Sequence, residues 1–237
     1  MEKHFYRAVN PCFEGCGYVI DTDVADLPPR MKCSVDLFPV FNILMPFWNK
    51  SGLSLDSACN SMLLLSDYLD IIQEIEQSGG TMIPTSLFNQ NEPIKEIPLS
   101  ILKEMIFPYV DLYKSTGITL DIYALPYFWE YIWEIVRKNF YPQKLGRFIS
   151  LFMFDNLQQT KHFLNECHQE DGTIICSVKL IETRRLEKYD ASWLDNVPTD
   201  CTFNTCIKYI RNYWDGKYAN NPNPEYLFSG KYQLSRI

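Results

Sequence analysis

The chain has 237 residues, of which 46% are hydrophobic and 22% are charged, a balance typical of a globular protein with a sizeable core. Its formal net charge of −7 argues against a surface coated in basic charge for tight, sequence-independent binding to duplex nucleic acid. The apolar runs are all shorter than the roughly 18 residues of a membrane span, so we expect a protein that does not enter the membrane.

The eight cysteines raise the question of disulfides or a metal site. The first residues contain no apolar signal region, and a chain of this length does not need disulfides, so we expect reduced thiols and a cytoplasmic location. The alternative is zinc, for which the candidate ligands are Cys12 with Cys16, Cys201 with Cys206, and Cys167 with His168. These pairs lack the C-x2-C spacing of structural zinc sites, so we predict no metal site.

The first part of the chain contains two short apolar runs that predict strands. The expected strands are residues 4–9 and 18–20, and the glycine-bearing turn between them is residues 12–17. Residues 35–48 are apolar and aromatic, but Pro39 and Pro46 interrupt them, so we expect irregular chain here and not a single helix.

Apolar residues spaced by three and four predict a long helix over residues 54–77. Ser54 is the expected N-cap, and Gly79-Gly80 end the helix. The apolar stripe most simply faces the core of the protein. Docking of a partner helix is the alternative.

The second half alternates helices and strands. The expected helices are 99–113, 127–139, 156–167 and 201–214, and the expected strands are 147–154, 173–181 and 226–234. Asp155 and Asp200 are the expected N-caps, and Glu134 and Arg137 are expected to face solvent. The sequence has neither a GxGxxG nor a Walker A loop, so the pattern favours an α+β fold over a doubly wound sheet. Arg184, Arg185 and Lys188 are a candidate basic patch, although adjacent arginines are usually solvated surface.

Three polar residues lie in or beside apolar strands, where burial is costly without a partner. Arg7 in the first strand could meet a pyrophosphate, which guanidinium binds bidentately. Ser150 interrupts the strand at 147–154, although a serine in such a place usually bonds to backbone. Glu225 opens the last strand and could bind a sugar hydroxyl and stabilise positive charge on the ring carbon.

Six motifs occur in a characteristic order. They are HFYR at residues 4–7, WEYIWEIVR at 129–137, FYP at 140–142, RFISLF at 147–152, YWDGK at 213–217 and EYLF at 225–228. In this order they resemble a bacterial family of uncharacterised proteins whose fold is similar to that of ADP-ribosyltransferases. The resemblance covers residues 1–25 and 127–237. It implies an α+β fold with a split antiparallel sheet, in a single domain across 1–237, with 30–125 as a mainly helical insertion or divergent region.

The resemblance also implies a site of the arginine–serine–glutamate type for NAD as a substrate, with no metal. Arg7 would hold the NAD diphosphate or the nicotinamide ribose, and Ser150 would support the nicotinamide pocket. Glu225 would bind the ribose 2′-hydroxyl and favour an oxocarbenium-like transition state as nicotinamide leaves. Tyr6 and Tyr213 are candidate stacking residues for nicotinamide or the acceptor.

The implied activity is transfer of ADP-ribose to a macromolecule, nucleic acid or protein, by a toxin or phage-defence effector. The apolar stripe at 54–77 could dock an antitoxin-like protein partner. Two positions depart from the family pattern. Ser150-Leu151-Phe152 stands where the second motif usually has Ser-Thr-Ser or a tyrosine. Asn223 stands where many protein-modifying members have Glu or Gln, which disfavours transfer to protein arginine. The alternatives are a non-catalytic nucleotide- or partner-binding protein of the same fold and a different nucleotide-processing enzyme that uses Arg7 and Glu225.

Overall fold

The computed structural model describes residues 4–10, 15–23, 29–63, 65–120, 125–167, 172–198 and 200–237. The chain divides into two compact units. Unit 1 comprises Met1–Lys32, Trp133–Asn196 and Ile210–Ile237, and unit 2 comprises Cys33–Ile132 and Val197–Tyr209. The architecture is α+β, and the paired strands are antiparallel.

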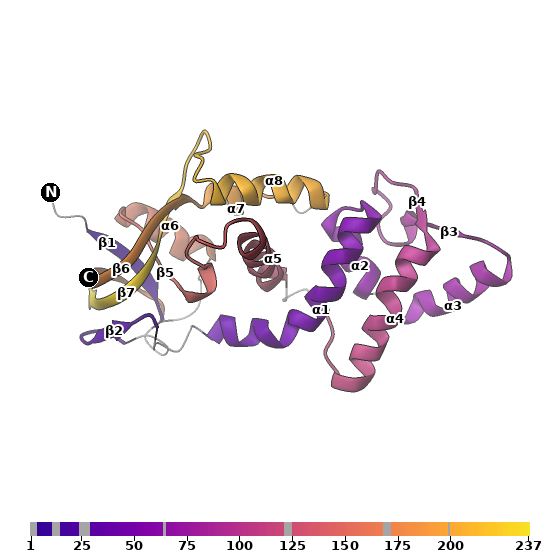
Figure 1. The fold of residues 1–237 in the computed structure, drawn as a ribbon, viewed down its shortest axis with the longest axis horizontal. Coiled ribbons are helices and arrows are strands. Elements are labelled where there is room, and N and C mark those ends of the chain that lie inside the picture. Colours follow the sequence, from indigo (N-terminus) through magenta and orange to yellow (C-terminus); the bar gives the residue numbers. More distant parts are fainter. Residues whose placement is uncertain are drawn as a thin grey trace. The chain divides into compact units, whose positions relative to one another are not determined.

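The strands of unit 1 form one five-stranded antiparallel sheet. They are β1 (Phe5–Val9), β2 (Val19–Asp21), β5 (Leu151–Met153), β6 (Ile174–Asp190) and β7 (Pro224–Arg236). Their order is β1-β6-β7-β2, and β5 also pairs with β7. The long strands β6 and β7 run side by side and curl together, as Figure 1 shows. β6 and β7 are the central strands of the sheet, because every other strand of the sheet pairs with one of them.

The hydrogen-bonded strands of this sheet close on themselves through the first strand, β1. Strand β5 pairs with the start of β7, and Phe154, just beyond β5, forms a bridge with Tyr6 in β1. Two backbone hydrogen bonds of 2.8 and 2.9 Å make this bridge. Strands β1, β6, β7 and β5 therefore form a closed ring of pairing, which leaves few strand edges between them.

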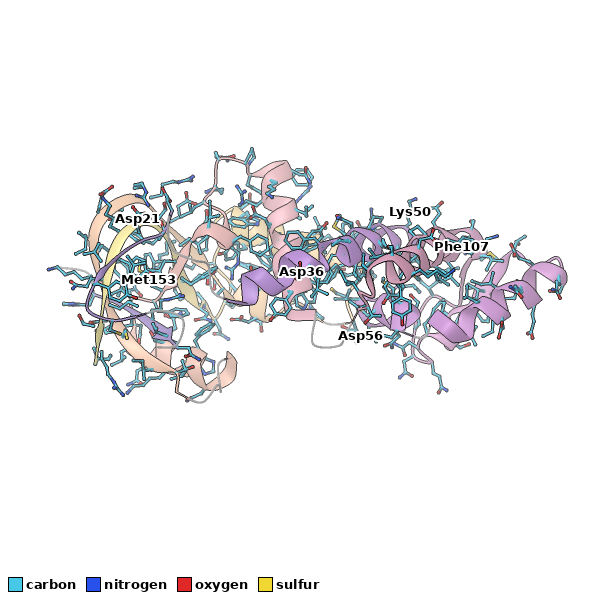
Figure 2. The ribbon with its side chains drawn as sticks, turned by 90° about the horizontal axis from the view of Figure 1, so that it is seen from below. Asp21, Asp36, Lys50, Asp56, Phe107 and Met153 are labelled. Atoms are coloured by element: carbon cyan, nitrogen blue, oxygen red, sulfur yellow. The ribbon has the colours of Figure 1, made fainter. Side chains whose placement is uncertain are left out.

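One apolar cluster is buried in the sheet. Its members are Phe5, Val9, Leu151, Met153, Cys176, Val178, Tyr226, Phe228, Tyr232 and Leu234. Met153 is completely buried and is labelled within the sheet region in Figure 2. Members of the cluster alternate along β5 and β6, and in β1 they are Phe5 and Val9, which share one face, as the period of a strand requires.

Helical segments of unit 1 lie between the strands in sequence. They include α6 (Leu157–Cys167), α7 (Ser192–Asp195) and the ends of α5 (Leu125–Phe140) and α8 (Phe203–Trp214). Helix α6 follows β5 and packs beside β1. Helices α7 and α8 form the connection from β6 to β7, and a 3-10 turn, η3 (Arg147–Ile149), precedes β5.

Unit 2 is mainly helical. Its elements are α1 (Pro29–Ser51), α2 (Leu55–Leu63), α3 (Leu65–Gln77), β3 (Met82–Pro84), η1 (Thr85–Leu87), β4 (Glu96–Pro98), α4 (Leu99–Thr116) and parts of α5 (Leu125–Phe140) and α8. The rings of Phe128 and Phe203 lie 6.1 and 5.3 Å from that of buried Trp48. The Trp48 indole N–H donates to the Leu53 carbonyl at 3.0 Å, so its polar edge is satisfied inside this aromatic core.

The prediction for residues 35–48 was wrong, because this segment lies inside the helix α1. Pro39 and Pro46 are both exposed, whereas Phe41 and Trp48 between and beyond them are buried. Burial of one aromatic face offsets the backbone hydrogen bonds that the prolines cannot donate.

The predicted helix at 54–77 is two helices, α2 and α3, on either side of residue 64, which lies outside the described residues. Its N-cap is confirmed, since the backbone N–H of Ser57 donates to the Ser54 hydroxyl oxygen at 3.2 Å. The predicted cap at Asp155 was wrong. The side-chain oxygen of Asn156 accepts from the Gln158 N–H at 2.8 Å, and Asp155 instead accepts a 2.6 Å bond from the Tyr226 hydroxyl.

The predicted strand at 147–154 was partly wrong. Residues 147–149 form the 3-10 turn η3, and the strand is limited to Leu151–Met153. The strand predicted at 173–181 extends much further, to Asp190, because β7 supplies a partner along its whole length. Over the part of the chain that the structure describes, no helix has both the length and the apolar character needed to cross a bilayer.

A substitution at Gly230 would test how closely β6 and β7 approach each other. Its φ is +150°, and a Cβ at this position would lie 2.0 Å from the Glu182 carbonyl oxygen, beside the irregular register of β6. We expect Gly230→Ala to lower the free energy of unfolding in urea by roughly 2–4 kcal/mol. Gly79→Ala is the control, because Gly79 also has a positive φ but no neighbour within 4 Å. Its expected cost is about 1 kcal/mol, and equal costs for the two variants would contradict the contact explanation.

Candidate functional site

A buried ionic cluster lies near the start of β7, and it consists of Arg147, Tyr213 and Glu225. The Arg147 guanidinium donates through Nη1 to Oε1 of Glu225 and, at 2.7 Å, to the Tyr213 hydroxyl oxygen. The Tyr213 hydroxyl in turn donates to the same carboxylate oxygen at 2.5 Å. The side chains of Arg147 and Glu225 are only 7% and 6% exposed, so the two charges compensate each other away from water.

Aromatic rings enclose the Arg147–Tyr213–Glu225 cluster. The Tyr213 ring stacks on Tyr189 at 4.7 Å and meets Trp133 edge-on at 4.8 Å. The Arg147 guanidinium lies over the Phe152 ring, 4.5 Å from its centroid. Burial raises the pKa of Tyr213 well above its usual value, so Tyr213 stays protonated and acts as a donor.

A second ion pair fixes the chain that leads into Arg147. The guanidinium of Arg137 binds Glu134 bidentately, with distances of 2.9 and 2.8 Å, and donates to the Lys144 carbonyl at 2.8 Å. The hydrogen bond to Glu134 is the main reason that the pKa of Arg137 is raised. Glu134 is buried, so the prediction that it faces solvent was wrong. A Cβ on Gly146 would lie 3.3 Å from both partners, so a larger residue here would require the pair to shift by a few tenths of an ångström.

Asp190, at the end of β6, organises the loop before Glu225. Its completely buried carboxylate accepts from the backbone N–H groups of Ser192, Ala219 and Asn223 at 3.0, 2.7 and 2.7 Å. Burial opposes ionisation of Asp190, but these bonds and one from the Ser192 hydroxyl outweigh it and lower its pKa. Asp190 thereby fixes the backbone two residues before Glu225.

The side chain of Asn223 is held from both sides. Its amide donates to Asp195 at 3.0 Å, and its carbonyl oxygen accepts from the side chain of Gln159 in α6. Gln159 also donates to the Pro224 carbonyl at 2.9 Å. The approach to Glu225 is therefore anchored to β6, α6 and α7.

A family model described as a protein of unknown function (DUF2441) matches residues 104–237, which is more than half of the chain. The chain belongs to the DUF2441 family. No curated protein matches it. The residues matched to DUF2441 contain the whole Arg147–Tyr213–Glu225 cluster and Asp190, whereas Arg7 on β1 precedes them.

In this DUF2441 protein, the site residues predicted from the sequence differ from one another in the groups that they contact. Glu225 and Tyr213 are in direct contact. Arg7 donates to the Phe152 carbonyl in β5 at 2.8 Å, and Tyr6 forms the backbone bridge to Phe154. The Ser150 hydroxyl donates to the Gly146 carbonyl, which is the backbone bond usual for a serine at such a position. Thus β5 links the segments that carry Arg7, Ser150 and Glu225.

Arg147 was missed as a site residue. Its signal was available, because it stands at the edge of an apolar run, and the argument applied to Arg7 holds equally for it. Its partners, Tyr213 and Glu225, are 66 and 78 residues away in sequence, so no local pattern points to them.

The candidate basic patch is balanced by carboxylates. Arg184 pairs with Asp21, and Arg185 pairs with Glu187. Lys188 lies 3.9 Å from a carboxylate oxygen of Asp155. Within the described residues no three His, Cys, Asp or Glu side chains gather as a metal site would require, while Cys12 and His168 lie outside them.

The cost of breaking the buried ion pair is the first prediction for the site. Arg147→Met leaves the Glu225 carboxylate buried without its cation, so we expect the free energy of unfolding in urea to fall by about 3–5 kcal/mol. Lys50→Met is the matched control, because the Lys50–Glu104 pair is 54% and 58% exposed and contributes less than about 1 kcal/mol. A loss for Arg147→Met no larger than that of the control would contradict the assignment of a buried pair.

The lowered pKa of Asp190 leads to a prediction about the stability of the protein in acid. Because its pKa in the folded state is below the ordinary value of 3.8, its contribution to stability is complete above that value. The contribution is lost as the pH falls from about 4 through the lower folded-state pKa. We expect Asp190→Asn to lower the urea midpoint near neutral pH and to flatten its decline as the pH falls below about 4. An acid dependence identical to that of the wild type would rule out this role.

Proposed function

We propose that this chain is an NAD-dependent ADP-ribosyltransferase that transfers ADP-ribose to a macromolecule, either nucleic acid or protein. The observation that carries the proposal is that the segments with Ser150, Arg7 and Glu225 all adjoin or bond to strand β5. Ser150 directly precedes β5, Arg7 donates to the Phe152 carbonyl within it, and Glu225 lies in β7, its hydrogen-bonded neighbour. In the same proposal unit 1 has the split antiparallel sheet of ADP-ribosyltransferases, and residues 30–125 are an insertion in a single domain across 1–237.

The proposed chemistry assigns one task to each group. The Glu225 carboxylate binds the ribose 2′-hydroxyl and stabilises the positive charge that develops as the ribose–nicotinamide bond breaks. Arg7 binds the NAD diphosphate, Ser150 supports the nicotinamide pocket, and Tyr6 stacks on nicotinamide or the acceptor. Tyr213, proposed from the sequence for stacking, is better suited to orienting Glu225, since its hydroxyl donates to that carboxylate.

A non-catalytic nucleotide- or partner-binding protein is the second candidate. It is favoured by the ion pair of Glu225 with Arg147, because a guanidinium on the carboxylate reduces the negative charge that an oxocarbenium ion would meet. Under the transferase proposal the protein acts in the cytoplasm as a toxin or phage-defence effector. An antitoxin-like protein is its proposed partner.

The experiment follows NAD labelled in its adenylate half, incubated with the purified chain and cell extract. Free nicotinamide is quantified, and the sample is divided between nuclease and protease before macromolecular label is measured. For Glu225→Gln we expect a loss of nicotinamide release of about 100-fold or more. Asp215→Asn is the control, since this exposed carboxylate bonds to Tyr141 and lies outside the proposed machinery. Unfolding curves of both variants separate lost chemistry from lost fold.

The outcomes distinguish the candidates. Label that survives protease but not nuclease identifies a nucleic-acid acceptor, and the converse identifies a protein. Neither label nor nicotinamide from the folded wild-type chain, together with measurable NAD binding, supports the non-catalytic protein. Consumption of a nucleotide without release of nicotinamide supports a different nucleotide-processing enzyme.

A further inference from the structure

Two thiols from distant parts of unit 1 meet beside the sheet. The sulfur of Cys16, in the turn before β2, lies 3.4 Å from that of Cys176 in β6. Cys16 is exposed to solvent, whereas Cys176 is completely buried. In the β1–β6 pairing Cys176 stands directly opposite Arg7. A solvent-accessible thiol therefore lies in contact with one that solvent cannot reach.

The turn that carries Cys16 is anchored to β7 at the next residue, Gly17. The Gly17 N–H donates to the Leu234 carbonyl at 3.0 Å, and the Gln233 side chain donates to the Gly17 carbonyl at 3.0 Å. These two bonds to β7 thus hold Cys16 over Cys176, and a shift of about an ångström would bring the sulfurs to bonding distance.

We propose that Cys16 and Cys176 are an oxidation site that closes reversibly into a disulfide. A peroxide oxidises the exposed Cys16 thiol to a sulfenic acid, with release of one water in the case of hydrogen peroxide. The Cys176 sulfur then attacks the Cys16 sulfur, the S–O bond breaks, and the hydroxyl leaves with the Cys176 proton as a second water. Overall, two thiols lose two hydrogen atoms and one hydrogen peroxide becomes two waters. A thiol reductant reverses the step by exchange.

The difference in exposure sets the order of events. Only Cys16 is open to the oxidant, and Cys176 is placed to resolve its sulfenic acid before further oxidation. The disulfide would join positions 160 residues apart, which restricts the unfolded chain strongly. It would also fasten the turn to the segment of β6 that pairs with Arg7. This inference does not depend on the proposed transferase activity.

The test uses the full reduced chain, freed of reductant and treated with hydrogen peroxide. Peptides from a digest without reduction are mapped by mass spectrometry. We expect a product that links Cys16 to Cys176, lighter by two hydrogens than the two thiol peptides together and reversed by dithiothreitol. Oxidation should also raise the thermal unfolding midpoint by about 5 °C or more. Cys16→Ser should abolish both effects without disturbing the fold, because the side chain is exposed.

Cys12→Ser is the matched control, since Cys12 is the nearest other thiol in the sequence. The Cys16–Cys176 product should persist in this variant. A link from Cys16 to Cys12 or to a second chain, or a sulfinic acid at Cys16 with no cross-link, would overturn the proposal. An unchanged unfolding midpoint in the cross-linked protein would overturn its structural consequence.

Discussion

A buried charge is costly unless an opposite charge and hydrogen bonds replace its water, and Arg147 and Glu225 in unit 1 meet this condition through Tyr213. The three residues come from the turn before β5, the end of α8 and the start of β7. Loss of any one of them leaves a polar partner in an aromatic enclosure. The cluster therefore fixes how α8 meets the start of β7, on which the position of Glu225 depends.

Other buried carboxylates each anchor a different segment. Asp190 gathers backbone N–H groups of the loop before β7, and Glu134 holds Arg137 and through it the turn before Arg147. In unit 2, Glu92 accepts from the backbone N–H and hydroxyl of Ser54 at the start of α2. Asp190 and Glu92 accept from backbone N–H groups that regular secondary structure leaves unpaired, whereas Glu134 acts through the Arg137 guanidinium.

Local signals predicted much of the fold. The sequence pattern predicted the helices α4 and α5 and the strands β1 and β7, and the serine cap of α2 was identified correctly. The errors have a common cause. In α1, burial of aromatic side chains stabilises the helix despite its two prolines. The 3-10 turn at Arg147 depends on contacts with residues more than sixty positions away in the sequence. The sequence indicated Glu225 and Tyr213 as site residues, but it did not indicate that they are in contact. Contacts between residues far apart in the sequence cannot be read from the spacing of neighbouring residues.

The place of β7 in the sheet has a consequence for the growing chain on the ribosome. Strand β7 pairs with β2, β5 and β6, yet it spans Pro224–Arg236 and is the last strand of the sheet to be made. Until it emerges, β2 and β5 have no strand to pair with along their length, and the ring of strands stays open. Synthesis from the N-terminus therefore leaves apolar strand surface exposed until β7 has left the ribosome, and unit 1 completes its sheet only then.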